Sequence, residues 1–374
     1  MILSDVCEFI VDCPHSTAPD EGKGYPLIRT PNVGKGRLDL NGVHRVSESV
    51  YKQRIQRGAP RANDLIFARE APAGNVALVQ ENQTVCLGQR TVLIRPNVQK
   101  VNPQYLVYYL LSPKPQYELL GTANGATVAH VNLPAIRNLK IELPEKSVQD
   151  KTGTILVTYD DLIENNQKQI KLLEEAAQRL YKEWFVDLRF PGYENTKIVD
   201  GVPEGWSRTN INEILTFHRG YDLTKNEMKA GRYPVVGSTT VIGYHNEFKI
   251  KGPGIVTGRS GSLGKYQFIW DNFWPHNTSL YISDYKDHNI FFVYSLLQTV
   301  DFASLNNGGA IPTLNRNVLS NIEVIEPTDE LQEMFAKIAE PQYQKIKNLE
   351  KQNDKLKTAR DLLLPKFMSG EVEV

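Results

Sequence analysis

Two long stretches of the chain carry apolar residues at alternating spacings of three and four. In the first stretch one set of positions recurs every seven residues: Leu156, Ile163, Ile170, Ala177 and Trp184. A second set lies between them: Tyr159, Asn166, Leu173 and Leu180. This heptad pattern predicts a long helix whose apolar seam packs against another helix.

The same pattern recurs 183 residues later. Its positions are Ala339, Ile346, Asn353, Arg360 and Phe367, with Gln342, Leu349, Leu356 and Leu363 between them. We expect the two helices to pack antiparallel as a coiled-coil hairpin. Proline lacks the helical N–H, so Pro365 predicts that the second helix kinks or ends near Leu362.

Asn166 and Asn353 are polar residues at seam positions. Either the seam is partly exposed there, or the two amides are buried and fix the register of the helices at a cost in stability. On the second interpretation, Asn353→Leu would raise the melting temperature and loosen the register.

The duplication extends beyond the helices. Residues 124–185 align without a gap to 307–368, residues 64–69 align with 254–259, and Gly74 aligns with Gly264. We therefore predict globular domains at 1–145 and 190–327, each followed by a long helix, at 146–189 and 328–374. Short β-rich runs predict strands at 64–67, 76–79, 91–94 and 139–143, and again at 254–256, 266–270, 279–282 and 322–325. Helices are expected at 103–111 and 290–297.

The expected fold class is therefore α+β. Two domains of twisted, mainly antiparallel sheet are joined by two long antiparallel coiled-coil helices in a pseudo-two-fold arrangement. No run of the sequence resembles a membrane span or a signal peptide, and the three cysteines lack disulfide or zinc spacing. We expect a cytoplasmic protein without a membrane partner.

Charge is balanced over the whole chain but not within it. Residues 1–145 hold 16 Lys and Arg against 13 Asp and Glu, and residues 190–327 hold 12 against 13. This balance argues against a strongly basic nucleic-acid coat, yet it allows a basic face on each domain.

Motifs for catalysis are missing from the sequence. There is no Walker loop, no His-Glu-x-x-His, no Cys-x-x-Cys pair, no nucleophile elbow and no Asn/Asp-Pro-Pro-aromatic motif of amino-methyltransferases. Residues 258–265 suggest a phosphate cradle, but their spacing differs from that of the known loop, so a tight β-turn is favoured. We expect no enzymatic activity, no cofactor and no metal.

Polar side chains suited to base edges and phosphates recur near the predicted strands. In the first domain they are Arg29, Asn32, Lys35, Arg37, Arg69, Asn75, Gln89 and Arg90. In the second they are Arg219, Tyr221, Ser238, Thr239, Thr240, Tyr244, His245, Asn246, Arg259, Lys265 and Asn277. Arg69 and Arg259 are the strongest candidates because each follows an aligned strand and precedes an aligned glycine. The alternative for this pair is a structural salt bridge at the turn.

Three segments resemble a known family. They are Leu180–Asp187, Asp361–Glu371 and the opening Val202-Pro203-Glu204-Gly205-Trp206. With the duplicated plan, they resemble the specificity subunit of type I restriction–modification systems over the full chain. The first domain departs from this pattern, because it lacks the Pro-Glu-Gly-Trp opening and begins at the equivalent of Thr209. A pseudo-two-fold arrangement would let the C-terminal tail complete that domain.

The resemblance implies two target-recognition domains, each reading half of a bipartite, asymmetric site in double-stranded DNA. It also implies that the helices set the spacing and dock two methyltransferase subunits, which bring S-adenosylmethionine and methylate adenine. A restriction (motor-nuclease) subunit would join the complex.

Two other functions compete with DNA recognition. The main rival is a coiled-coil scaffold that binds proteins without DNA specificity, because the duplication and the helices fit it equally well. A stand-alone enzyme acting on nucleic acid is disfavoured by the missing motifs. The bases recognised do not follow from the sequence, because base readout depends on loop geometry.

Overall fold

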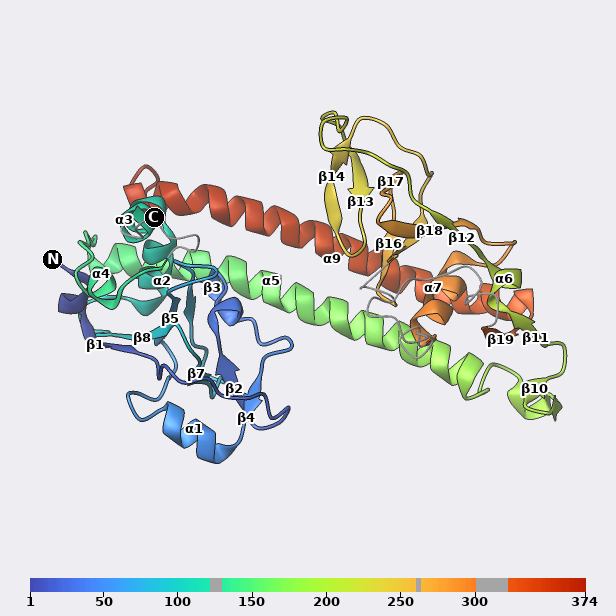
Figure 1. Cartoon of the computed structure of the whole chain (residues 1–374), viewed down its shortest axis with the longest axis horizontal. Helices are drawn as coiled ribbons and strands as arrows, with labels where there is room; N and C mark the ends of the chain where they lie inside the picture. The colour runs from blue at the N-terminus through green and yellow to red at the C-terminus, as the bar shows by residue number, and fades with distance from the viewer. Residues whose placement is uncertain (122–129, 260–263, 301–321) are drawn as a thin grey trace. The chain divides into compact units, whose positions relative to one another are not determined.

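The computed structural model describes residues 1–121, 130–259, 264–300 and 322–374, which separate into two compact units (Figure 1). Unit 1 consists of residues 1–167 and 350–374, and unit 2 consists of residues 168–349. Each unit contains a globular part and a portion of both long helices. The start of the ungapped repeat, at residues 124 and 307, and residues 260–263 of the loop at 258–265 lie outside the described residues.

Unit 1 contains a five-stranded and a three-stranded sheet. The larger sheet has the order β1-β8-β5-β6-β3, and its neighbours pair antiparallel except for β3 with β6. The smaller sheet has the order β4-β2-β7, in which β2 and β7 are parallel. The strands are β1 Cys7–Asp12, β2 Tyr25–Ile28, β3 Gly36–Arg37, β4 Arg45–Val46, β5 Leu65–Ala68, β6 Val76–Leu78, β7 Cys86–Leu87 and β8 Thr91–Pro96.

Unit 2 repeats this plan. Its main sheet has the order β12-β18-β15-β16, and a second sheet has the order β14-β13-β17, in which β13 and β17 are parallel. Two small pairs, β11-β19 and β10-β9, complete it. The strands are β9 Ile198–Val199, β10 Val202–Pro203, β11 Ser207–Asn210, β12 Thr216–Arg219, β13 Tyr233–Val236, β14 Val241–His245, β15 Gly254–Gly258, β16 Tyr266–Ile269, β17 Trp274–Pro275, β18 Ser279–Asp284 and β19 Glu323–Glu326.

The order β1-β8-β5-β6 matches β12-β18-β15-β16, as the sequence repeat predicts, while β3 has no counterpart among the described strands of unit 2. β5 and β15, the aligned strands, lie at the same place in each order and are fully buried. Gly74 and Gly264, the aligned glycines, both have positive φ, at 89° and 78°. A residue with a side chain rarely adopts this conformation, which explains glycine at both turns.

Short helices cover the sheets. α2 (Pro103–Leu111) and α7 (Ile290–Thr299) each begin after an asparagine whose side chain accepts a backbone N–H at the helix start, Asn102 from Tyr105 and Asn289 from Phe291. These two helices were predicted. The others are α1 Glu48–Arg54, α3 Pro113–Gly121, α4 Leu133–Arg137 and α6 Ile211–Ile214.

The predicted strand at 139–143 is wrong. This segment forms only one isolated bridge, between Lys140 and Ile2. The corresponding strand of unit 2, β19, pairs with β11 over four residues. A strand forms only where a partner strand supplies hydrogen bonds over its length, and residues 139–143 have one such position.

The two long helices are α5 (Lys146–Tyr181) and α9 (Asp329–Ser369). A π-helical turn at Lys182–Val186 follows α5. The second helix does not end near Leu362, because α9 continues through Pro365 to Ser369. Around Pro365, Leu364, Phe367 and Met368 pack against the core of unit 1, which offsets the hydrogen bond that proline removes.

The helix seam in unit 1 contains buried polar pairs. Asn166 and Asn353 are 8% and 5% exposed, and Asn166 Nδ2 donates to Asn353 Oδ1 at 2.9 Å. Asp160 and Arg360 form an ion pair, and the hydroxyl of Tyr108 on α2 donates to Asp160 Oδ2 at 2.6 Å. The seam is therefore buried at the asparagines, which excludes the partly exposed alternative.

Each unit has its own hydrophobic core. In unit 1 the core lies between the five-stranded sheet and α2, with Tyr105, Tyr108 and Leu156 among its members. The C-terminal tail adds to it, and Lys151 Nζ donates to the carbonyl of Val374 at 3.2 Å. The tail thus belongs to the first domain, as expected. Among the helices of the described part of the chain, none is long and apolar enough to span a membrane.

Candidate nucleic-acid interface

Figure 1 shows the β13–β14 hairpin of unit 2. It contains or adjoins four of the predicted contact residues, and all four are exposed. Thr239 and Thr240 lie in its turn, Tyr244 lies on β14, and Asn246 follows β14. Within the described ranges, the side chains of these four residues make no hydrogen bond to the protein. Their donors and acceptors are therefore available to a ligand.

Apolar side chains accompany these polar groups. Val241 and Ile242 at the start of β14 are 41% and 49% exposed, and Tyr244 is 57% exposed. The turn itself is closed by a hydrogen bond from the amide of Gly237 to the carbonyl of Thr240 at 2.9 Å. The hairpin is thus an ordered ribbon that exposes both apolar and polar groups.

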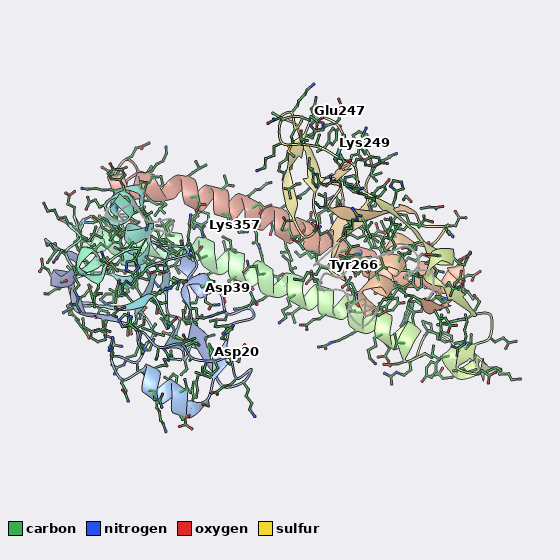
Figure 2. The ribbon with its side chains drawn as sticks, viewed as in Figure 1. Asp20, Asp39, Glu247, Lys249, Tyr266 and Lys357 are labelled. Atoms are coloured by element: carbon green, nitrogen blue, oxygen red, sulfur yellow. The ribbon has the colours of Figure 1, made fainter. Side chains whose placement is uncertain are left out.

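A cluster of aromatic rings lies beneath the loop that follows β14. Tyr221 and Tyr281 share a hydroxyl hydrogen bond at 2.9 Å, and His218 stacks at 6.0 Å from the ring of Tyr221. The Lys249 ammonium lies 4.7 Å from the centre of the Trp274 ring. Figure 2 shows Lys249 on this loop, near Glu247. Burial, with the Tyr221 hydroxyl, raises the pKa of Tyr281, so that phenol stays neutral.

Other candidates in unit 2 are engaged within the protein. The Ser238 hydroxyl donates to the carbonyl of Thr278 at 2.8 Å, and buried His245 accepts from the amide of Lys229 at 3.0 Å. Asn277 donates to Asp222, and Arg219 lies 3.8 Å from the same carboxylate. These contacts orient loops and leave fewer groups for DNA.

Arg259 and Lys265 flank the undescribed residues 260–263. The backbone N–H of Arg259 donates to the carbonyl of Thr278 at 3.1 Å, which holds its backbone beside the main sheet. The carbonyl of Lys265 accepts from the Thr257 hydroxyl at 3.0 Å. Both residues therefore extend from the fixed end of a sheet, and the Lys265 side chain is exposed.

In unit 1, three candidate amides bond to the protein's own backbone. Asn32 is buried and donates to the carbonyl of Asp39 at 3.2 Å, and Asn75 donates to that of Val33 at 2.9 Å. Gln89 donates to the carbonyl of His15 at 2.7 Å. These amides hold loops together, so their donors are occupied.

Arg69 forms a structural salt bridge, the alternative to a DNA contact. It is 9% exposed and its guanidinium pairs with Asp12 Oδ2 at 2.8 Å. It also donates to the carbonyl of Val131 at 2.8 Å and contacts His130 Nε2 at 2.8 Å. The aligned residue Arg259 has no such ion pair among the described residues. A local sequence pattern could not separate the two, because Asp12 lies 57 residues away.

The remaining candidate cations of unit 1 differ in whether their side chains form ion pairs within the protein. Arg37 pairs with Asp161, and Arg90 pairs with Glu70 at 2.8 Å. Lys35 is exposed without an ion pair to a described residue, and it borders a cavity of about 240 Å³ together with Arg360. The Arg29 Nε is buried without a hydrogen-bond partner among the described residues.

Sequence reasoning missed Arg232 and Lys249. Both lie beside the hairpin, and each is stacked on an aromatic ring, Arg232 over Tyr233 at 5.0 Å and Lys249 over Trp274. For Arg232 the sequence signal was its neighbour Tyr233, whereas the ring under Lys249 is distant in sequence. Such pairs are common where proteins stack on nucleic acids. Among the described residues, no group of three His, Cys, Asp or Glu could hold a metal ion.

A family model described as the type I restriction modification DNA specificity domain matches residues 1–175 and 203–358. The specificity subunit of the type I restriction enzyme MjaIX of Methanocaldococcus jannaschii is 27% identical over 366 residues, which cover 89% of this chain and 83% of that protein. The HindI specificity subunit of Haemophilus influenzae is 22% identical over 404 residues, with 84% and 87% covered.

A solved structure has a similar fold. The S subunit of a type I restriction-modification system from M. genitalium has a TM-score of 0.61 and 17% sequence identity, over 98% of this chain and 95% of that one. At this identity the likeness concerns the fold alone, which agrees with the α+β class and the two repeated units.

Proposed function

The chain belongs to the family of type I restriction modification DNA specificity domains, and from this premise we propose how it serves as a specificity subunit. The globular domain of each unit reads one half of a bipartite, asymmetric site in double-stranded DNA. The long helices set the distance between the two half-sites and dock two methyltransferase subunits. Restriction subunits join through the assembled complex.

The observation that carries this proposal is the pair of matched strand orders with unlike exposed side chains. β4-β2-β7 and β14-β13-β17 are equivalent sheets. β4 has two residues, whereas β14 has five and forms a ribbon with β13. One scaffold with two different loop sets would present two different readers, and hence an asymmetric site.

In unit 2 the β13–β14 hairpin is the proposed base-reading element. A two-stranded ribbon fits the major groove of B-DNA, where asparagine pairs with adenine and apolar side chains contact the methyl group of thymine. Asn246 and the pair Val241 and Ile242 supply these groups. Arg232 and Lys249, at the end of the hairpin away from its turn, are placed to contact phosphates.

In unit 1, Arg29 and Lys35, which form no ion pair with a described residue, belong to the segment that connects β2 with β4 through β3. This segment takes the place of the hairpin turn of unit 2. We propose it as the counterpart reader, held by Asn32 and Asn75. The excess of basic residues in 1–145 supports weak general attraction to DNA.

The helices suit a spacer. At 1.5 Å per residue, the 36 residues of α5 extend about 54 Å, longer than one turn of DNA. Apolar side chains on their outer faces, such as Leu172 and Leu362, are 64% and 63% exposed. We propose that methyltransferase subunits cover them. Those partners would supply S-adenosylmethionine and transfer its methyl group to adenine, while this chain supplies recognition only.

The same exposed leucines also favour the second candidate, a protein-binding scaffold without DNA specificity. Both functions need docked proteins, and only the first needs DNA contacts. The decisive experiment therefore measures sequence preference with the methyltransferase partner present.

The experiment selects bound sequences from random DNA with the reconstituted complex, at several salt concentrations. We expect a bipartite consensus and an affinity that falls steeply with salt. Replacing residues 1–145 by the corresponding domain of a relative should change one half of the consensus only. If the complex bound DNA without sequence preference and without dependence on salt, the scaffold function would be favoured instead. If the domain replacement changed both halves of the consensus, the two domains would not read their half-sites independently.

Single substitutions localise the contact. Asn246→Ala should relax the consensus at one position, with a loss of about 1–3 kcal/mol of discrimination. Asn195→Ala is the matched control, because it removes an exposed asparagine elsewhere in unit 2. Equal effects of the two substitutions on the consensus would show that the hairpin does not contact the bases.

A further inference from the structure

The helix seam of unit 1 contains two consecutive polar layers. The first is the buried amide pair Asn166–Asn353, and the second is the ion pair Asp160–Arg360. Asp160 is 3% exposed, and only 13% of the Arg360 side chain is exposed. In each of these two layers the polar group on α5 has its partner on α9, and both groups are largely buried.

The space around Asp160 is closely filled. A Cβ atom at Gly36, which has φ of 92°, would lie 2.5 Å from Asp160 Oδ2 and 3.2 Å from the Tyr108 ring. The Tyr108 hydroxyl occupies the same carboxylate oxygen. One oxygen of Asp160 thus accepts from Tyr108 of the globular domain, and the other pairs with Arg360 of α9.

The equivalent layers of unit 2 contain no such polar pairs. The repeat offset of 183 relates Asn166 to Leu349 and Asn353 to Ile170. It likewise relates Asp160 to Tyr343 and Arg360 to Ala177, and these two residues belong to the buried core of unit 2.

Tyr108, which bonds to Asp160 in the charged layer of unit 1, also has a different residue at its equivalent position in unit 2. α2 and α7 begin after the equivalent caps Asn102 and Asn289, so Tyr108 corresponds to Ser295. The Ser295 hydroxyl bonds to that of Tyr343 at 3.3 Å, which places the two residues together as Tyr108 and Asp160 are. One half of the duplicated seam therefore carries polar pairs and the other half carries neutral layers.

This asymmetry distinguishes α9 from a second copy of α5. If α5 of another chain took the place of α9 in the same antiparallel register, each residue would be replaced by its equivalent. Ala177 would then stand where Arg360 stands, and Ile170 where Asn353 stands. Asp160 would be buried without a counter-charge and Asn166 without an amide, and both are unfavourable.

Two copies of α9 would be mismatched in the same way. Arg360 would face Tyr343, and Asn353 would face Leu349. The remaining apolar positions do not by themselves exclude either pairing, because Ile163, Leu173 and Leu180 recur as Ile346, Leu356 and Leu363. A polar residue at a seam position is a known means of selecting partner and register in coiled coils.

We propose that Asn166–Asn353 and Asp160–Arg360 form a pairing code, by which the seam of α5 accepts α9 and rejects a second copy of α5. The code keeps the two unlike domains in one assembly and prevents like domains from pairing. It concerns the association of helices and does not depend on whether either domain binds DNA.

The test uses the full chain, prepared with normal and with heavy nitrogen, mixed in equal amounts, unfolded and refolded together. Lysine cross-linking and mass spectrometry then identify links between a normal and a heavy chain. In an α5–α5 pair Asp160 faces Ala177 and Asn166 faces Ile170, so the midpoint lies near Lys168. Links between Lys168 of one chain and Lys168 or Lys171 of the other therefore report the rejected pairing.

We expect such links to be rare in the unchanged chain. Removing both layers with Asp160→Asn, Asn166→Leu, Asn353→Ile and Arg360→Met should raise them roughly tenfold or more, because the mismatches disappear. Where this variant does not refold, judged by circular dichroism, Asn166→Leu with Asn353→Ile alone gives the same answer with a smaller rise. Links at the level of the unchanged chain in a refolded variant would overturn the code.

A second variant tests the code by creating a match. Ile170→Asn places an amide opposite Asn166 in an α5–α5 pair, while in the native pairing it faces Leu349. Links at Lys168 should therefore increase. Leu173→Asn is the matched control, since it adds the same amide to the same seam at a position that does not meet Asn166. Equal links in the two variants would mean that general destabilisation, and not matching, governs association.

Discussion

Asp160 and Arg360, 200 residues apart in the sequence, form an ion pair within the helix seam of unit 1. Breaking a largely buried pair by removing one partner costs more than removing both, because the remaining charge has no counter-ion. Arg360→Met should therefore lower the free energy of unfolding by about 3–5 kcal/mol. Asp160→Asn combined with Arg360→Met should recover most of that loss in thermal unfolding.

The control for this prediction is Lys357→Met, which removes an exposed cation from the same helix (Figure 2). It should change stability by less than about 1 kcal/mol. If Arg360→Met were no more destabilising than Lys357→Met, the ion pair would contribute little to the fold.

The hydrogen bond between Asn166 and Asn353 reverses the stability effect expected for the single substitution Asn353→Leu. On the sequence alone, Asn353→Leu is expected to stabilise the protein. Because Asn353 accepts from Asn166, the single change leaves a buried donor unsatisfied and should cost about 1–3 kcal/mol. Asn166→Leu with Asn353→Leu together should melt at or above the temperature of the unchanged protein. A single variant that melts higher than the double one would contradict the bond.

Arg69 should matter for stability and not for base readout. Its ion pair with Asp12 and its bond to the Val131 carbonyl hold three segments of unit 1 together. Arg69→Met should destabilise the unit by about 2–4 kcal/mol, while the DNA consensus of the complex stays unchanged. Arg259→Met is the informative comparison, since it should leave the melting temperature near its original value and weaken DNA binding.

Lys249 should act as a phosphate contact. Its ammonium lies over the Trp274 ring, which orients it without neutralising its charge. Lys249→Ala should weaken binding to all sequences equally and reduce the slope of log K against log salt by about 1. A change of consensus without a change of slope would assign Lys249 to base readout.

Cysteine alkylation can follow the unfolding of unit 1, because Cys7, Cys13 and Cys86 all belong to it. Burial raises the pKa of Cys7 to about 12 and that of Cys86 to about 11. At pH 8 the reactive thiolate is therefore scarce in the folded unit, and alkylation should be slow until the unit opens. Arg69→Met should accelerate it, and a substitution confined to unit 2, such as Asn246→Ala, should not.

Much of the fold could be predicted, because periodicity and duplication are properties of the sequence itself. The seam positions from Leu156 onward follow from the heptad, and the alignment of residues 64–69 with 254–259 correctly pairs β5 with β15. Pro365 does not end the helix because its cost is offset by tertiary contacts of Phe367 and Met368, which no local pattern reveals.

The candidate site was harder to predict, because a polar residue type does not disclose its partner. Asn32 and Thr239 look equally suited to DNA in sequence, yet Asn32 is buried and bonded to the Asp39 carbonyl, and Thr239 is exposed. Lys249 could not be identified from the sequence because the ring on which it stacks, Trp274, is distant in sequence and is brought to it by the fold.

Unit 1 is assembled from both ends of the chain, whereas unit 2 is continuous from residue 168 to 349. On the ribosome, the first domain is synthesised before unit 2 but lacks the helical turns that cover its core until residues 350–374 have been made. Unit 2 has all its residues sooner. The order of completion should therefore reverse the order of synthesis, and nascent unit 1 would need protection while it waits for residues 350–374.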